Sequence, residues 1–166
     1  MTEQLLAPTG VEHAAIGFSS EEIDTAAPTR AARLKWVIVV DETLPAGRAV
    51  NAAICAATAT ALAVPGLQGP AAIDADGQSH PGLPWAGCTI LAADAATITT
   101  VRGKAAGSDE CFVSDVPSAA QHTRVYDEYR ESVATERTSA MEYYAVSIVG
   151  PRKRVDRIVG RLDLMA

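Results

Sequence analysis

The residues best suited to chemistry in this sequence gather in one loop that follows an apolar run. Asp41 ends the run, Gly47 and Arg48 lie in the loop, and Asn51 follows one helical turn later. A guanidinium can hold a carboxylate or phosphate in a planar fork. We therefore predict that Arg48 orients an anionic group and that Asn51 hydrogen-bonds it, within a binding loop that includes Asp41 and Gly47. The alternative is that Asp41 caps the loop, Arg48 is solvated and Asn51 starts a helix.

Histidine is the side chain that most readily exchanges a proton near neutral pH, and His80 is our first candidate for that role. It lies in the polar turn "DGQSHPG" with Asp76, and loops carry functional groups more often than the framework does. His122 is the second candidate and His13 the third; the alternative for each is an ordinary surface histidine. Trp85, in the loop "HPGLPW", would line the mouth of a pocket or simply pack in the core.

Several other chemistries are not predicted, because their motifs are missing. A metal site built from His80, His122 and Asp115 lacks the short ligand spacing that such sites show. The sequence contains no G-x-G-x-x-G, no P-loop and no G-x-S-x-G elbow, so no cofactor and no hydrolase triad is predicted. The three cysteines match no zinc or redox spacing and are expected to be small apolar residues of a reduced cytosol: Cys55, Cys88 and Cys111.

Composition limits the partners of the chain. With 166 residues and 48% hydrophobic content, it can bury the core of a single domain. Its 14 basic and 20 acidic residues give a net charge of -6, which disfavours nucleic-acid binding because that needs an excess of positive charge. No apolar stretch approaches the ~20 residues of a membrane helix. We predict a cytoplasmic protein without a membrane partner, which binds a small molecule and could form a homodimer.

Strand patterns alternate with helix patterns along the chain. The apolar runs predict strands, and the alanine-rich or amphipathic stretches predict helices. Strands are expected at 34–40, 86–94, 110–117 and 140–150, and helices at 46–64, 94–107, 118–138 and 151–165. We predict an irregular lead over 1–33 and a single domain over 34–166. Its fold class is α/β, a three-layer α/β/α sandwich with a mixed four-stranded central sheet. A pocket is expected at the carboxyl end of the first strand, where α/β sheets place ligands.

Two families resemble this sequence. "LKWVIVVDETLPAGRAVNAAICAATA" resembles the first strand, loop and helix of the type II peptidyl-tRNA hydrolases, and "YYAVSIVGPRKRVDRIVGRLDL" resembles their closing strand and last helix. The same first strand and loop, the segment from Asp76 to Gly82 with His80 and Pro81, and "RVYDEY" resemble the domain-of-unknown-function 2000 family (DUF2000). That family is similar to the hydrolases in fold and has no established activity. The resemblance implies a peptidyl-tRNA hydrolase II-like fold.

The hydrolase resemblance carries its chemistry over only in part. The resemblance places the basic residue of the family's loop on Arg48. The family's helix histidine falls on or next to Ala57, and its helix glutamine falls near Ile54. Without its acid/base groups a catalytic set loses orders of magnitude in rate. We therefore expect an activity other than that of the hydrolases, namely an enzyme acting on a small acyl or carbonyl compound. A non-catalytic ligand-binding or regulatory homodimer is the alternative, and peptidyl-tRNA hydrolysis ranks third.

Overall fold

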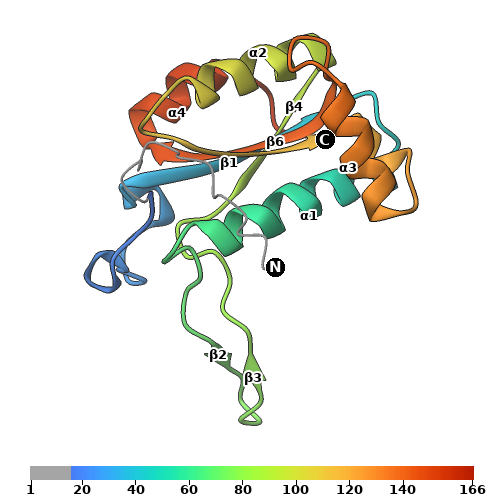
Figure 1. Ribbon diagram of the computed structural model, residues 1–166. Helices are drawn as coiled ribbons and strands as arrows, with labels where there is room; N and C mark the ends of the chain where they lie inside the picture. Colours follow the sequence, from blue (N-terminus) through green and yellow to red (C-terminus); the bar gives the residue numbers. More distant parts are fainter. Residues whose placement is uncertain (1–15) are drawn as a thin grey trace, which may run out of the picture.

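A four-stranded mixed β-sheet forms the centre of the computed structural model, which describes residues 16–166 (Figure 1). Its strands lie in the order β4 (Thr89–Ala93), β1 (Leu34–Asp41), β6 (Tyr143–Pro151) and β5 (Phe112–Pro117). β1 runs parallel to β4 and antiparallel to β6, and β6 is antiparallel to β5. The predicted mixed α/β class with a four-stranded central sheet is therefore confirmed. The candidate His13 lies outside the described residues.

Helices pack on both faces of this sheet, because alternate side chains of each strand point to opposite sides. Trp36, Ile38 and Val40 of β1 join a core with α1 (Ala46–Ala63). Val37 and Val39 join a second core on the other face, with α2 (Ala95–Ala106) and α4 (Arg152–Val159). The continuous apolar run of β1 is explained by this position, since a strand covered on both faces needs apolar residues on both.

A chain of buried polar groups fastens α1 to the sheet. Trp36 Nε1 donates to Ser147 Oγ at 2.8 Å, and that oxygen lies 2.7 Å from Thr60 Oγ1. Thr60 in turn donates to the carbonyl of Ala56 at 2.8 Å. Small residues make this close approach possible, since Ala52 and Ala56 are buried against the strands. Within residues 16–166, none of the helices combines the length and the apolar character needed to cross a membrane.

Residues 16–33 and a hairpin lie beside the sheet. Two short 3-10 turns, Ser20–Glu22 and Thr29–Ala31, precede β1, and Phe18 is buried in the α1 core. The Phe18 carbonyl lies close to Gly66, whose φ of +75° and missing side chain allow the approach. The chain then forms a separate hairpin of β2 (Ala72–Ile73) and β3 (Ser79–His80), which projects away from the sheet (Figure 1).

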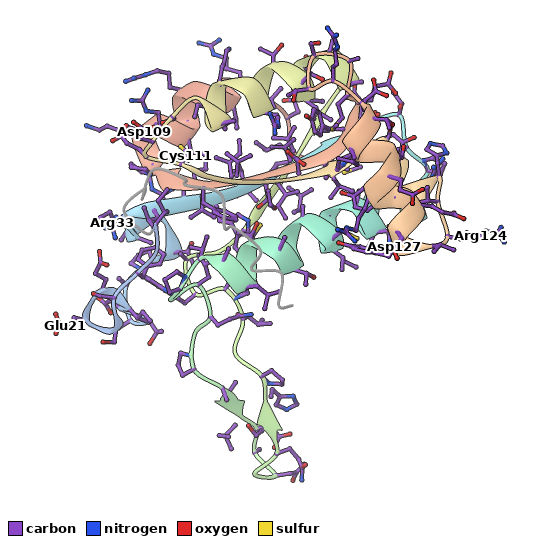
Figure 2. The ribbon with its side chains drawn as sticks, in the orientation of Figure 1. Glu21, Arg33, Asp109, Cys111, Arg124 and Asp127 are labelled. Carbon is purple, nitrogen blue, oxygen red and sulfur yellow. The ribbon has the colours of Figure 1, made fainter. Side chains whose placement is uncertain are left out.

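The single helix predicted over 118–138 is wrong. The chain forms a 3-10 turn, η3 (Ser118–Gln121), and then α3 (Tyr126–Thr135). Thr123 lies between them, and its β-branched side chain donates to the carbonyl of Ala119 instead of extending the helix. No residue of α3 is buried, and Arg124 at its start extends away from the molecule (Figure 2). α3 is thus a surface helix, in which Tyr129 and Val133 of the predicted spacing are half-buried and the other residues are exposed.

Candidate functional site

Arg48 and Asn51, the two residues predicted to contact an anion, are brought together by Gln121. Arg48 Nε donates to Gln121 Oε1 at 2.9 Å, and Gln121 Nε2 donates back to the Arg48 carbonyl at 2.8 Å. The same Nε2 lies 3.1 Å from Asn51 Oδ1. Arg48 and Asn51 lie in the first turns of α1, and Gln121 lies in η3. The amino end of α1 is therefore tied to the segment that follows β5.

Tyr144 supports the other side of the Arg48 guanidinium. Arg48 Cζ lies over the Tyr144 ring, 5.4 Å from its centroid, a geometry in which a cation is attracted to the π face. The two Nη atoms of Arg48 make no hydrogen bond to any of residues 16–166. The side chain is half-buried. Arg48 is thus held at Nε and at its face, while its terminal nitrogens remain available to a ligand.

His122 belongs to the same cluster. Its Nε2 lies 2.9 Å from the Tyr144 hydroxyl, and the two rings are 6.0 Å apart between centroids. β6 positions Tyr144 one residue after its start, and His122 is the residue at the end of η3. Tyr144 therefore contacts both a fixed guanidinium and an imidazole. This arrangement joins a cationic group to a side chain of the type that can exchange a proton.

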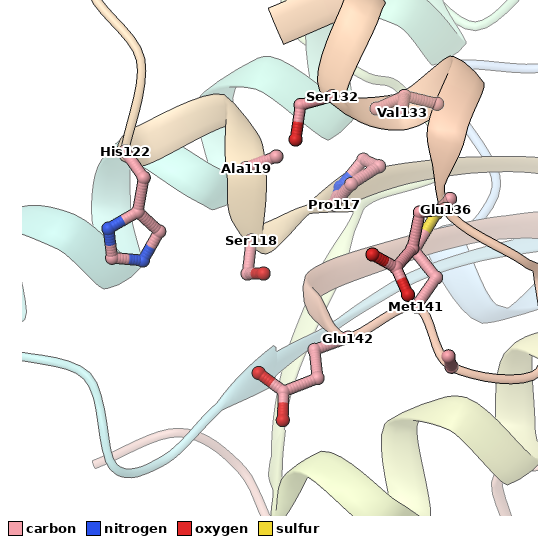
Figure 3. Close-up of a pocket in the computed structure, with 10 residues that line it drawn as sticks. Pro117, Ser118, Ala119, His122, Ser132, Val133, Glu136, Met141 and Glu142 are labelled. Atoms are coloured by element: carbon pink, nitrogen blue, oxygen red, sulfur yellow. The ribbon is translucent and has the colours of Figure 1, made fainter.

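A pocket of about 310 Å³ opens beside His122 (Figure 3). Ser118 and His122 line one side of it, and Glu136 and Glu142 line another. The volume lies at the lower end of the range of small-molecule sites. A compact ligand could therefore lie against the imidazole of His122.

Asp41 and Gly47 have local roles in the loop. The Asp41 carboxylate is 5% exposed and accepts from the Thr43 amide at 2.9 Å and from its hydroxyl at 2.7 Å. This is the capping role given above as the alternative for Asp41. Gly47 lies in the first turn of α1, where a Cβ would meet no atom within 4 Å. Gly47 leaves the approach to the amino end of α1 open.

The structure does not bring His80 and Asp76 to Arg48. Both lie in the β2–β3 hairpin, which projects from the molecule beyond the carboxyl end of α1, whereas Arg48 is at its amino end (Figure 1). His80 Nε2 lies 3.2 Å from Asp74 Oδ2. The Gln78 amide, and then the His80 hydrogen bond, hold the pKa of Asp74 below its ordinary value. His80 therefore has a partner within its own turn, and a catalytic set of His80, Arg48 and Asn51 is not assembled.

Trp85 is also separate from the Arg48 cluster. Its ring centroid lies 4.8 Å from that of Phe18, and its Nε1 donates to the Gly66 carbonyl at 2.8 Å. It lines a small hollow with Glu22 and Arg33 of the lead. These contacts of Trp85 with the core agree with the predicted packing role. They do not place Trp85 at the mouth of a pocket beside the Arg48 loop.

The three residues of the metal site that the sequence analysis rejected have separate partners in the structure. Asp115 accepts from Arg102 Nε at 2.9 Å, His80 is in the hairpin, and His122 contacts Tyr144. Within the part of the chain that the structure describes, no three His, Cys, Asp or Glu residues gather as metal ligands do.

Gln121 and Tyr144 were missed in the sequence. Both are common residue types in predicted secondary-structure segments, and each is far along the chain from Arg48. A signal for Gln121 existed, since it directly precedes the candidate His122. Nothing in the doublet "YY" distinguishes Tyr144, which contacts Arg48, from Tyr143, which is buried in the core on the other face.

A second pocket, of about 610 Å³, lies on the β4 side of α1. The middle of β1, through Trp36 and Ile38, the loop after β1 and the helix all contribute to it. Its walls are almost wholly apolar, and it is called the apolar pocket below. Its lining from the loop and helix includes Glu42, Leu44, Ala49, Val50, Ala53, Ile54 and Ala57.

Comparison with known proteins agrees with the fold and leaves the chemistry open. None of the curated proteins compared with the chain matches it. The solved structure of Atu0240, a protein of unknown function from Agrobacterium tumefaciens strain C58, is similar, with a TM-score of 0.75 and 15% identity over 81% of this chain and 98% of that one. The peptidyl-tRNA hydrolase II-like fold stays a prediction. The family model for a protein of unknown function, DUF2000, matches residues 34–166. Because the match covers most of the sequence, the chain belongs to the DUF2000 family.

Proposed function

We propose that this protein is an enzyme that acts on a small anionic acyl or carbonyl compound bound at Arg48. The observation that carries the proposal is the shared contact of Arg48 and His122 with Tyr144. It places a cation with free terminal nitrogens beside a hydrogen-bonded imidazole. His122 takes the proton-exchanging role that the sequence suggested for His80.

Arg48 is suited to bind because its position is fixed before a ligand arrives. The Gln121 hydrogen bond at Nε and the Tyr144 ring limit the rotamers of Arg48. A side chain that is already ordered loses less conformational entropy on binding. Its two Nη atoms can donate to both oxygens of a carboxylate, and Asn51 can add a further hydrogen bond.

His122 and Tyr144 are suited to move a proton. When the Tyr144 hydroxyl donates to Nε2, neutral His122 carries its own proton on Nδ1. Nδ1 can give that proton to a carbonyl oxygen of the substrate while Nε2 takes the Tyr144 proton. Tyr144 is then left as a phenolate, whose negative charge the neighbouring Arg48 guanidinium stabilises.

The experiment is a thermal-shift screen with small carboxylic acids, their esters and their amides, followed by turnover measured by proton NMR. We expect Arg48→Ala to lose the shift given by compounds that stabilise the parent protein. His122→Ala and Tyr144→Phe would still bind these compounds but lose turnover by at least ~100-fold. Arg124→Ala and His80→Ala are matched controls, which would behave as the parent does. Binding that survives in Arg48→Ala would reject the proposal.

A non-catalytic ligand-binding or regulatory homodimer is the second candidate. It is favoured by Val50 and Ile54, which lie one turn apart on α1 and are 58% and 57% exposed. Large apolar side chains on one exposed helix face are typical of interfaces. Light scattering at about 100 µM protein tests it, because association depends on protein concentration. The mass of a dimer that Ile54→Glu reduces to the mass of a monomer would support this candidate. A monomeric parent protein would reject it.

A further inference from the structure

The apolar pocket lies on the β4 side of α1, whereas Arg48 contacts residues on the β6 side. It is therefore distinct from the site proposed above. We infer that the apolar pocket binds a small apolar molecule that carries one cationic amine.

The walls of the apolar pocket favour a hydrocarbon or aromatic body. Its lining includes Trp36 and Ile38 of β1, Val50 and Ile54 of α1, and Met165. The Trp36 Nε1 proton is already bound to Ser147, so the indole contributes only its ring to the pocket. A ligand that covers these side chains would remove apolar surface from water, which favours binding.

The charge of the apolar pocket favours a cation. Glu42 is the charged side chain among its lining residues, all of which lie within residues 16–166. Its carboxylate has no hydrogen-bond or ion-pair partner in that part of the chain, although its amide is fixed to the Ala93 carbonyl at 3.0 Å. The lining contains no Lys, Arg or His. An amine would gain a partner at Glu42, whereas a carboxylate of the same size would be repelled.

The volume and the charge of the apolar pocket favour a small molecule over a second copy of the chain. Its volume of about 610 Å³ lies in the middle of the range of small-molecule sites. A two-fold contact across it would bring the Glu42 carboxylates of both copies into one interface. Like charges in such an interface oppose association.

The test is calorimetric titration at pH 7 with three probes that share one alkyl body: octylamine, octanol and octanoate, each below its micelle concentration. We expect octylamine to bind at least ~10-fold more tightly than octanol and octanoate to bind most weakly. Glu42→Gln would remove the preference for the amine and leave octanol binding unchanged. Glu128→Gln, an exposed acid on α3, is the matched control and would keep the preference.

Blocking variants locate the binding site. Ala53→Leu should weaken all three probes by filling the pocket. If Ala53→Leu fails to fold, Ile54→Trp serves instead, because the Ile54 side chain is largely exposed and tolerates a larger ring. Octanoate binding as tightly as octylamine would overturn the inference. So would binding that neither blocking variant changes, or a dimer that Ile54→Glu dissociates. The Arg48→Ala variant should bind octylamine normally, which separates this result from that of the proposed function.

Discussion

Gln121 is bound to Arg48 at both ends of its carboxamide. Its oxygen accepts from Arg48 Nε at 2.9 Å, and its nitrogen donates to the Arg48 carbonyl at 2.8 Å. One side chain of η3 thus fixes both the guanidinium and the first turn of α1. The position of Arg48 depends on a residue 73 positions away in the sequence.

Replacement of Gln121 should release Arg48 without unfolding the protein. In Gln121→Ala we expect the Arg48 Nε–H resonance to lose its protection from solvent exchange, and the free energy of unfolding to fall by about 1 kcal/mol. Anion binding at Arg48 would weaken by about 5-fold, because the freed side chain must be ordered again. Nitrogen–proton correlation spectra measure the first effect. Gln78→Ala, in the hairpin, is the control; equal protection in both variants would contradict the role of Gln121.

The buried hydroxyl of Thr60 should contribute measurably to stability. Thr60→Val keeps the shape of the side chain but leaves Ser147 without its partner at 2.7 Å. Ser147 keeps the hydrogen bond from Trp36, but its hydroxyl proton loses its acceptor. Because a buried donor without an acceptor pays a desolvation cost, we expect unfolding in urea to become easier by about 1–3 kcal/mol. Thr58→Val, on the exposed side of α1, should change stability by less than about 0.5 kcal/mol. Equal effects of the two substitutions would show that the buried network is not stabilising.

The lead should loosen in acid through Glu22. The Arg33 hydrogen bond, and next the Ser19 amide, lower the pKa of Glu22 from 4.5 to about 2. Because the folded pKa lies below the unfolded one, the stabilisation is complete above pH 4.5 and is lost as the pH falls toward 2. Solvent screens this exposed pair, so the effect is small.

Denaturation curves between pH 2 and pH 6 measure the contribution of Glu22. Glu22→Gln should be less stable than the parent at pH 6 and equal to it at pH 2. Glu21→Gln, its neighbour, should follow the parent throughout. Parallel curves for the parent and Glu22→Gln would refute the assignment.

The cysteines should differ in reactivity. Burial raises the pKa of the Cys88 thiol to about 12, and burial also raises that of Cys111, whereas Cys55 is exposed. The thiolate is the reactive form, so at pH 8 Cys88 should be nearly inert in the folded protein. We expect a single fast reaction with a disulfide reagent, which Cys55→Ser abolishes, and three reacting thiols in urea. Fast labelling of Cys88 in the folded state, seen by mass spectrometry, would contradict this.

Much of the fold could be predicted because burial dictates residue type. The continuous run of β1 and the alanines of α1 are direct consequences of a strand covered on both faces and a helix packed close to it. The position of β6 between β1 and β5 could not be predicted, because pairing partners leave no periodic pattern. The break before α3 was missed because helical spacing at Val125, Tyr129 and Val133 does not require burial.

Only the site residues that are close together in the sequence were predicted. Arg48 and Asn51 follow a central strand within a few residues, so fold rules identified them. Gln121 and Tyr144 reach them only through the tertiary structure. His80 was preferred to His122 because its turn looked polar and exposed, yet the hairpin gives it a partner of its own in Asp74.

The place of β6 in the sheet has a consequence for biosynthesis. Of the four strands of this sheet, β6 is the last to leave the ribosome, yet it separates β1 from β5 and supplies Ser147, the partner of a tryptophan 111 residues earlier. The nascent chain must therefore carry an incomplete sheet until β6 has been made. Folding dominated by such distant pairings is slow, and unpaired strand edges attract other chains. Nascent chains stalled before β6 should require chaperones, whereas the finished protein should not.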